Sequence, residues 1–361
     1  MQLLNRWLAC ALCFAFAGAC VAQNRSGPFH NNYSNQGPQG LLDLLHWQWA
    51  AAWQSLPPAP RSATPSVPAN MKFLHANNGS AQRPSVTWIG HATVLIQMGG
   101  LNILTDPVFS QRVSPISWIG PKRMQPPGIE LAELPHIDVV VISHNHYDHL
   151  DLASVQALSR QAGGSPQFLV PLGLKAWFTT QNILSAIELD WWQSHSIGPL
   201  EVVFTPTQHW SGRGIADRKQ SLWGGFALFA PNAQVFFAGD TAYSKDFADI
   251  RSHFAPRQTQ GGFDVALIPI GAYEPVWFMG DQHVTPAQAV QIHFDLGAKR
   301  SMGIHWGTFE LSDEALDEPP QALARARLAQ NLDDSAFFVI ALGETRQILQ
   351  EVTSQGAQTP D

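Results

Sequence analysis

The sequence has little charge and very little cysteine. Lys and Arg number 21 and Asp and Glu 28, so charged residues make up only 14% of the 361 residues, against about a quarter in ordinary globular domains. The formal net charge is −7 and no dense Lys/Arg run occurs, which argues against a nucleic-acid partner, because nucleic-acid binding relies on clustered cations. Hydrophobic residues reach 45%, which excludes a wholly disordered chain and is enough for a large buried core.

All three cysteines, Cys10, Cys13 and Cys20, lie in the first twenty residues. One positive charge, Arg6, precedes an uncharged stretch over residues 7–22 that ends in small side chains. A charged start, a short apolar run and small residues at the end are typical of an export signal. We therefore predict such a signal over residues 1–22 and a location in the bacterial periplasm. An uncleaved membrane anchor is the alternative, although the apolar run is short for one.

The segment Ala17-Gly18-Ala19-Cys20 resembles a bacterial lipoprotein signal, although Ala17 stands where Leu is usual. Lipid attachment at Cys20, which would anchor the protein to the envelope membrane, therefore stays open beside simple cleavage. In either case the mature chain keeps at most one cysteine. It then has no intrachain disulfide and no thiolate metal ligand.

Residues 23–70 are expected to form an N-terminal helix and a proline-rich connector. Leu41, Leu45, Trp49 and Trp53 recur at four-residue spacing and would share one face of the helix. This face either packs on the protein's own domain or lies at the surface and touches lipid. Prolines in the second half of the segment exclude a helix or an interior strand there.

Residues 71–361 show short strand-like runs that alternate with helical patterns, which predicts one domain of layered α and β structure. Expected strands cover residues 86–89, 93–98, 101–105, 138–143, 201–205, 226–229, 235–238, 265–270, 302–305 and 337–341. Expected helices cover residues 151–160, 286–295 and 321–331. Thr285, Pro286 and Gln288 would supply an N-cap, a first-turn proline and a capping box to the second of these helices. Because strands outnumber helices and hairpins are frequent, the fold class is mixed α/β (α+β) rather than a parallel doubly wound sheet.

The strongest motif follows the expected strand 138–143 and reads Ser143-His144-Asn145-His146-Tyr147-Asp148-His149. Loops at strand ends are where rigid scaffolds often carry active-site residues. Three imidazoles and a carboxylate within six residues offer nitrogen and oxygen ligands that suit zinc. Alternate residues of an extended loop point to opposite sides, so His144 and His146 can bind one ion while Asp148 and His149 turn toward a second. The alternative is a solvated loop in which the histidines occur by chance.

Three further candidate ligands stand at the ends of expected strands. His209, Asp240 and His305 each close a largely apolar run, and Gly239 allows the backbone to turn beside Asp240. Each alone is typical of an ordinary polar strand terminus. Together with the histidine motif they predict a site for two metal ions.

These residues and several longer strings resemble the metallo-β-lactamase superfamily, whose fold is an αββα sandwich with the metals at one edge of the two sheets. The resemblance runs from about Thr87 to Arg346 and is strongest to the N-acylphosphatidylethanolamine-hydrolysing phospholipase D family. The strings that carry it are Trp88-Ile-Gly-His-Ala-Thr-Val, Leu104-Thr-Asp-Pro-Val-Phe, Ile119-Gly-Pro-Lys-Arg, Glu188-Leu-Asp-Trp-Trp, Pro269-Ile-Gly-Ala-Tyr-Glu-Pro and Ile304-His-Trp-Gly-Thr-Phe.

The resemblance implies how two zinc ions are held in each chain. The ligands would be His144, His146 and His209 for one ion, Asp148, His149 and His305 for the other, and Asp240 as a bridge between them. Superfamily members that open β-lactams use Cys at the second metal, which the mature chain cannot supply, whereas a bridging Asp resembles the phosphodiesterase and thioesterase branches. Iron is the alternative metal, because nitrogen and oxygen ligands serve both. The family also implies a homodimer.

The resemblance further assigns catalytic residues. His283 would donate a proton or contact the phosphate, and Asp240 and Asp148 would act with it through the metals that they bind. Asp106 would orient a metal ligand rather than bind metal itself.

Substrate contacts are implied for a bulky segment just before His283. Gln282, Tyr273 and Trp277 would contact the lipid substrate, and Phe278 and Met279 belong to the same wall. Ordinary packing in the core is the alternative for each of the bulky residues. Val276 stands where members of the resembled family carry Arg, so the chain lacks that cation for an anionic head group.

The expected function follows from this chemistry. Two metal ions that share a water lower its pKa toward neutrality and present hydroxide to a bound phosphodiester. In the resembled family this reaction converts N-acylphosphatidylethanolamine to N-acylethanolamine and phosphatidic acid, at a membrane surface. We therefore expect a zinc-dependent phosphodiesterase of the phospholipase D type. The alternatives are a metallo-lactonase or esterase on the same fold, and a non-catalytic lipid-binding envelope lipoprotein, against which the complete ligand set argues.

Overall fold

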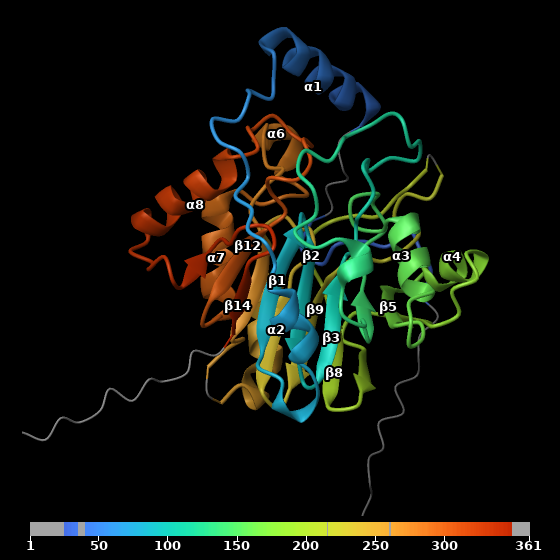
Figure 1. Ribbon diagram of the computed structural model, residues 1–361. Helices are drawn as coiled ribbons and strands as arrows, with labels where there is room; N and C mark the ends of the chain where they lie inside the picture. Colours follow the sequence, from blue (N-terminus) through green and yellow to red (C-terminus); the bar gives the residue numbers. More distant parts are fainter. Residues whose placement is uncertain (1–24, 35–39, 215, 260, 349–361) are drawn as a thin grey trace, which may run out of the picture.

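Two seven-stranded mixed sheets pack face to face and carry helices on their outer faces (Figure 1). The computed structural model describes residues 25–34, 40–214, 216–259 and 261–348. The predicted export signal and Cys20 lie outside these residues. The arrangement confirms the expected mixed α/β class and the αββα sandwich.

The first sheet has the strand order β14-β1-β2-β3-β4-β5-β6 and the second β13-β12-β11-β10-β9-β8-β7. The strands of the first sheet are β1 (Ser85–Gly90), β2 (Thr93–Met98), β3 (Leu101–Thr105), β4 (Val139–Val141), β5 (Gln167–Pro171), β6 (Ala186–Leu189) and β14 (Thr345–Gln347). Those of the second are β7 (Ser194–Ile197), β8 (Leu200–Thr205), β9 (Gly225–Ala230), β10 (Ala233–Phe237), β11 (Val265–Pro269), β12 (Ser301–Ile304) and β13 (Phe337–Phe338).

The α-helices of the described residues are α1 (Leu41–Gln54), α2 (Met71–Ala76), α3 (Leu152–Ser159), α4 (Lys175–Thr180), α5 (Asp246–Phe254), α6 (Val276–Met279), α7 (Pro286–Leu296) and α8 (Glu318–Ala329). Short 3₁₀ turns occupy Gly79–Ala81, Leu131–Glu133 and Ala255–Arg257. Within the described ranges, no helix is long and apolar enough to cross a bilayer.

The main core lies between the two sheets, and a second core lies under α3 and α4. In β4, Val139 and Val141 face the main core while Val140 joins the second one with Val155 of α3. Side chains of a strand alternate between its two faces, so a strand covered on both faces is apolar at every position. This explains the continuous run of Val and Ile before His144.

Several predicted local features are confirmed. Gly99 and Gly100 make the turn between β2 and β3 with φ of 63° and 80°, a region that glycine adopts without strain. Thr285 caps α7, since its side chain accepts from the backbone N–H of Gln288, and the Gln288 side chain accepts from the backbone N–H of Thr285.

Other local predictions were incomplete. The strands β5, β6, β7 and β14 were not predicted, and neither were α2, α4, α5 and α6. Helix α8 begins at Glu318, three residues before the expected start, because Pro319 and Pro320 occupy its first turn, where no intrahelical N–H bond is lost. The expected strand 337–341 is a strand only over β13.

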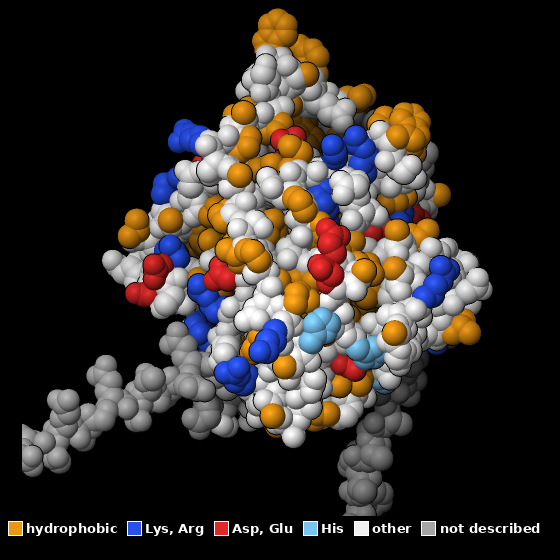
Figure 2. Space-filling view, in the orientation of Figure 1, with side chains coloured by type: hydrophobic (Ala, Val, Ile, Leu, Met, Phe, Trp, Pro, Cys, Tyr) orange, Lys and Arg blue, Asp and Glu red, His pale blue; other side chains and the backbone are white. Residues whose placement is uncertain are grey.

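Helix α1 forms where predicted, but its regular apolar face does not pack on the domain. Leu45, Trp49 and Trp53 are 53%, 66% and 82% exposed. Trp47 seats the helix instead, because its indole stacks on Phe278 of α6 with ring centroids 4.8 Å apart. Figure 2 shows apolar side chains projecting at the top of the molecule, where α1 lies in Figure 1.

Candidate metal centre

The predicted ligands come together at the end of the sandwich that faces α1. His144, His146, Asp148 and His149 follow β4. His209, Asp240 and His305 follow β8, β10 and β12 of the opposite sheet. The site therefore lies at the edge where both sheets end, and each ligand is held by a strand buried in the core.

Three histidines form one cluster. The Nε2 atom of His144 lies 2.8 Å from the Nδ1 atom of His146, and the Nε2 atom of His209 lies 3.3 Å from the same Nδ1 atom. Tetrahedral zinc with bonds of about 2.0–2.1 Å would hold its ligand atoms roughly 3.3 Å apart. The separations between these nitrogens therefore fit a single ion bound by all three rings.

A second cluster adjoins the first. The Nε2 atoms of His149 and His305 are 3.2 Å apart, and Oδ2 of Asp148 lies 3.4 Å and 3.5 Å from them. The carboxylate of Asp240 lies between the clusters: its oxygens are 3.0 Å from His149 and 3.1 Å from His305, and Oδ2 is 3.9 Å from the Nε2 atoms of both His144 and His209. Asp240 is thus placed to contact ions in both clusters.

The outer nitrogen of several rings is already engaged, which directs the inner nitrogen toward the site. The Nδ1–H of His149 donates to Oδ2 of Asp106 at 2.6 Å, and the Nδ1–H of His209 donates to the backbone carbonyl of Gln282 at 2.9 Å. Ser143 Oγ donates to Asp106 and lies 2.9 Å from Nδ1 of His144, from which it can accept. In each ring Nε2 is then the nitrogen that faces the cluster, as in metal-bound histidines anchored by a carboxylate or carbonyl.

The first cluster is in the protonation state that binds metal. Burial holds the pKa values of His144 and His209 well below the usual range and lowers the pKa of His146 to about 4. These imidazoles are therefore neutral at pH 7. Nε2 of His146 is buried and has no hydrogen-bond partner.

The second cluster attracts positive charge. Burial alone would raise the pKa of Asp148 and of Asp240, but His149 holds both well below the usual range, so both carboxylates are ionised. Burial alone would lower the pKa of His305, but Asp240 and Asp148 raise it to about 9. A metal cation bound there would be stabilised by the same two negative charges. The donor set, the spacing and the charge therefore fit two metal ions.

His91 is an additional member of the second cluster. It lies in the turn between β1 and β2, is 2% exposed, and its Nε2 atom is 3.1 Å from Oδ2 of Asp148. Because an ionised carboxylate only accepts hydrogen bonds, the Nε2 atom of His91 carries the proton and donates. His91 therefore orients Asp148 and does not present a lone pair from this nitrogen.

Backbone strain gathers at this site. His91, Asp106 and His305 have φ of 54°, 32° and 63°, values that non-glycine residues adopt at a cost. A hydrogen bond connects two of these strained residues, since the backbone N–H of His305 donates to the backbone carbonyl of His91 at 3.0 Å. Such strain persists only where the surroundings enforce it, and it is typical of functional sites.

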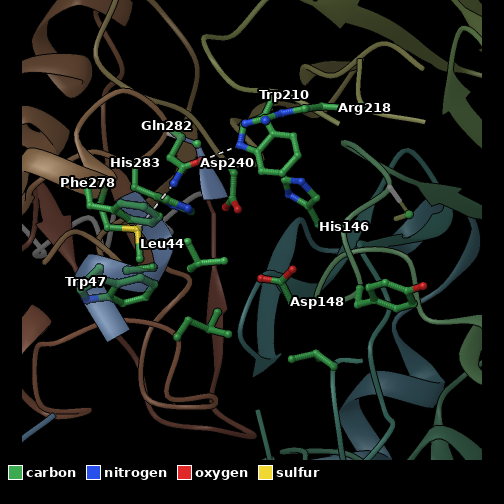
Figure 3. A pocket seen from close by; sticks show the side chains of 17 residues that line it. Leu44, Trp47, His146, Asp148, Trp210, Arg218, Asp240, Phe278, Gln282 and His283 are labelled. Carbon is green, nitrogen blue, oxygen red and sulfur yellow. Dashed lines mark hydrogen bonds between the residues drawn. The ribbon is translucent and has the colours of Figure 1, made fainter. Parts of the chain in front are cut away.

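The two clusters open into a cavity of about 570 Å³ (Figure 3). His146, Asp148 and Asp240 border it on the metal side, Trp210 lies beside His146, and Arg218 lies over the ring of Trp210. The remaining wall is mostly apolar and includes Leu44 and Trp47 of α1, Phe278, Met279 and Leu311. The site therefore combines a polar, metal-binding floor with an apolar wall.

The sequence profile of the Beta-lactamase superfamily domain matches residues 101–306, which is more than half of the chain. The chain belongs to the metallo-β-lactamase superfamily. Its fold agrees, because isothiocyanate hydrolase from Delia radicum gut bacteria superposes with a TM-score of 0.56 at 18% identity, over 73% of this chain and 98% of that one. As a member of this superfamily, the protein is a metal-dependent hydrolase.

Several metallo-β-lactamase relatives are similar along much of the chain. An uncharacterized protein of Mycobacterium tuberculosis is 40% identical, with coverage of 79% of this chain and 73% of the relative. The N-acyl-phosphatidylethanolamine-hydrolyzing phospholipase D 1 of Caenorhabditis elegans is 39% identical, with coverage of 72% and 74%. The mitochondrial enzyme of the same name in Saccharomyces cerevisiae is 36% identical, with coverage of 78% of this chain and 61% of that longer protein.

Two of the residues predicted to contact the substrate do not line the cavity of this metallo-β-lactamase fold. Tyr273 is buried and Trp277 is half exposed, and neither borders the cavity. Phe278 and Met279 do, because α6 is a single turn whose second half points inward while Val276 and Trp277 point outward. Gln282 and His283 border the cavity, and the carboxamide oxygen of Gln282 accepts from the indole of Trp210.

Sequence reasoning missed several residues of the site, among them His91, Arg218, Leu44 and Trp47. His91 stands in the string Trp88-Ile-Gly-His, which carried part of the family resemblance, so that signal was present but unassigned. Arg218 borders the cavity although the chain has Val276 in place of the expected cation. Leu44 and Trp47 lie on the side of α1 opposite to its regular apolar spacing, and nothing in the sequence alone indicates that this side faces the site.

Proposed function

We propose that the protein is a zinc-dependent phosphodiesterase of the phospholipase D type. It would hydrolyse N-acylphosphatidylethanolamine to N-acylethanolamine and phosphatidic acid. The observation that carries the proposal is the pair of adjoining ligand clusters, linked by Asp240, at the floor of a largely apolar cavity. Two relatives at 36–39% identity bear the name of this activity, which supports it.

The two clusters would hold one zinc ion each, with Asp240 between them. Metal ions bound there would lower the pKa of a water toward neutrality and neutralise charge on phosphate oxygens. Water adds to phosphorus, the bond from phosphorus to the ethanolamine oxygen breaks, and that oxygen takes up a proton. The attacking water releases the proton that the departing oxygen takes up, so the chain's own residues have to position the diester and the departing oxygen.

His283 and Gln282 are placed to contact the diester. His283 borders the cavity, its Nδ1 atom is buried and has no hydrogen-bond partner, and its ring centroid lies 5.5 Å from that of His305. Burial lowers its pKa to about 4, so the ring is neutral at pH 7. A neutral ring donates one hydrogen bond, which favours a contact to a phosphate oxygen or to the departing oxygen over transfer from an imidazolium.

The apolar wall suits the acyl chains of a phospholipid. Leu44, Trp47, Phe278 and Met279 surround the cavity on the side away from the ligands, and Arg218 at its rim supplies a cation for an anionic head group. A hydrolase for small polar diesters has no need of such a wall. Polar groups in a largely apolar pocket orient the ligand, while the apolar groups provide affinity.

Product analysis tests the proposal. The metal-loaded chain is incubated with N-acylphosphatidylethanolamine, and Asp240→Asn serves as the control variant. Release of N-acylethanolamine together with phosphatidic acid by the wild type, and its loss in the variant, would support attack at phosphorus. Release of free fatty acid would instead indicate attack at a carbonyl, and no product from a chain carrying two metal ions would refute the phospholipid substrate.

We also propose that the protein is exported to the bacterial periplasm and acts on phospholipid at a membrane surface, as a homodimer. The uncharged stretch over residues 7–22 supports export. Cell fractionation with mass spectrometry of the mature N-terminus tests export and lipid attachment at Cys20, and sedimentation velocity tests the dimer. Cytoplasmic protein with an intact N-terminus, or a monomer at all concentrations, would contradict these proposals.

A further inference from the structure

Helix α1 presents a bulky apolar face away from the protein. Leu42 is 81% exposed and Trp53 is 82% exposed, with Leu45 and Trp49 between them on the same side of the helix. The indoles of Trp49 and Trp53 stack on one another, with ring centroids 6.3 Å apart. Large exposed apolar patches are uncommon on soluble proteins and usually mark a docking surface.

A second exposed apolar group lies beside α1. It belongs to the loop over residues 107–129, in which Trp118 is 75% exposed and Ile119 is 51% exposed. Pro121 of this loop and Ala51 of α1 border a common cavity of about 460 Å³, which places the loop next to the helix, as Figure 1 also shows. We call Leu42, Leu45, Trp49, Trp53, Trp118 and Ile119 the entrance patch.

The entrance patch is continuous with the wall of the catalytic cavity. Leu44 and Trp47, on the opposite side of α1, border that cavity. Trp47 also borders the 460 Å³ cavity under the helix, whose lining includes Glu310 and Asp313, so α1 lies between the outside of the molecule and the cavity at the metal clusters. An apolar chain held at the patch could therefore reach the catalytic cavity beside α1, along Leu44 and Trp47.

The charge around the patch suits an anionic surface. The loop over residues 107–129 contains no Asp or Glu and has Arg112 and Lys122 near its surface, whereas Arg123 is buried; the whole chain has a net charge of −7. Lys122 is exposed, and its backbone forms an antiparallel β-bridge with that of Arg112 at the base of the loop. Figure 2 shows Lys and Arg atoms between the apolar groups at the upper edge of the molecule. On α1 itself the only formal charge is Asp43, which caps the backbone N–H of Gly40.

We propose that the entrance patch docks onto an anionic phospholipid bilayer, with α1 lying in the interface as the movable wall through which lipid enters the site. The choice of a bilayer as the occupant rests on the proposed phospholipid substrate. Tryptophan prefers the head-group region because its ring is amphipathic, and apolar helices with neighbouring cations bind anionic interfaces. Helix α1 is held mainly by α6 and the loop after β12, because Trp47 contacts Phe278 and Asp313 and the ring of His46 lies 5.5 Å from that of Trp277, so α1 can tilt without disturbing the sheets.

Vesicle flotation with the metal-loaded full-length chain tests the proposal. The vesicles are phosphatidylcholine with or without phosphatidylglycerol, and every variant keeps the same residues 1–24, so that this segment contributes equally. Trp49→Ala/Trp53→Ala should reduce partitioning at least about tenfold, because two indoles leave the interface. The matched control is Leu184→Ala/Leu328→Ala, which changes two leucines that are 80% and 79% exposed elsewhere on the surface and should bind as the wild type does.

Reversing the charge of a lysine beside the entrance patch provides a second, independent experiment. Lys122→Glu should weaken binding about fivefold or more, and only to vesicles that contain phosphatidylglycerol, since each cation near an anionic bilayer contributes a factor of about this size. Lys175→Glu, an exposed lysine at the start of α4, is the control and should have no effect. Thermal unfolding and metal content confirm that each variant is folded, because all the substituted side chains are exposed.

Three outcomes would be decisive. Unchanged flotation of Trp49→Ala/Trp53→Ala would overturn the proposal. Loss of a dimer in that variant, seen by sedimentation velocity with no change in flotation, would also overturn it and assign the patch to a second copy of the chain. Reduced flotation of the variant beside a wild type that binds vesicles but releases no N-acylethanolamine would uphold the docking surface while the proposed substrate fails.

Discussion

The hydrogen bond from His91 to Asp148 makes the clearest prediction about metal binding. His91→Ala removes the ring that orients Asp148 and leaves Oδ2 of this carboxylate free to rotate. The three-histidine cluster keeps its own anchors, Ser143 and the carbonyl of Gln282. We therefore expect His91→Ala to weaken the ion in the second cluster much more than the ion in the first.

The magnitude follows from what the imidazole contributes. Loss of a hydrogen bond that orients a metal ligand lowers metal affinity about 10- to 100-fold, or about 1.4–2.8 kcal/mol. The ring is also 2% exposed and lies 3.9 Å, centroid to centroid, from that of His305. Its removal should therefore cost about 2–4 kcal/mol of folding stability through the cavity and the lost hydrogen bond.

Chelator competition, followed by the release of the first and second ion, measures the effect directly. The matched control is His293→Ala, which deletes a histidine that is 5% exposed and bonds Ser301 at 2.8 Å, remote from the clusters. It should lose similar stability and keep both ions. His91→Gln, which retains an N–H donor, should recover part of the affinity. Equal affinity for the second ion in His91→Ala and the wild type would refute the assigned role of His91.

Three further predictions concern the same site. Removal of metal by a chelator should lower the Tm, by the equivalent of about 4 kcal/mol when the free ion had been about 1,000-fold above its Kd; calorimetry before and after zinc is restored checks this, and an unchanged Tm would contradict metal in these clusters. Gly239→Ala should lower the free energy of unfolding by about 1–3 kcal/mol, since φ is +61° and the new Cβ would lie 2.5 Å from Cβ of Ser143. The control, Gly198→Ala, has φ +55° but open space around it, so denaturant titrations should show a smaller loss. Arg218→Ala should raise KM for an anionic diester about fivefold, the worth of a partly exposed ion pair, with kcat and metal content retained; Arg160→Ala is the control, and an equal KM for the Arg218 variant would remove this residue from head-group binding.

The two sheets and the ligand positions were predictable because buried strands carry a strong local signal. Residues 139–142, just before the histidine motif, are apolar at every position, and polar residues that follow such a run have to lie at a sheet edge. The same reasoning placed His209, Asp240 and His305, and the structure brings all of them together. Strands with a weaker pattern were missed: β7 reads Ser194-His-Ser-Ile and has a half-exposed, polar face.

The remaining parts of the site depend on contacts between distant segments. His91 reaches Asp148 across 57 positions, and only the pairing of β1 with β2 and the closing of the sandwich bring them together. The orientation of α1 was open because its apolar residues surround more than one face, and the choice was made by Trp47, which stacks on Phe278 and donates to Asp313 at 2.9 Å. The same holds for α6, where four consecutive bulky residues gave no indication of which two face the cavity.

Asp106 contacts a ligand of the second cluster, His149, and the residue that anchors a ligand of the first cluster, Ser143. Its Oδ2 atom accepts from Nδ1 of His149 and from Oγ of Ser143, which in turn lies against His144. A shift of this one carboxylate therefore reaches a ligand on each side of Asp240, whereas a change at His91 reaches only one side. The affinities of the two ions are therefore coupled to one another through Asp106, which is buried beneath both clusters and belongs to neither.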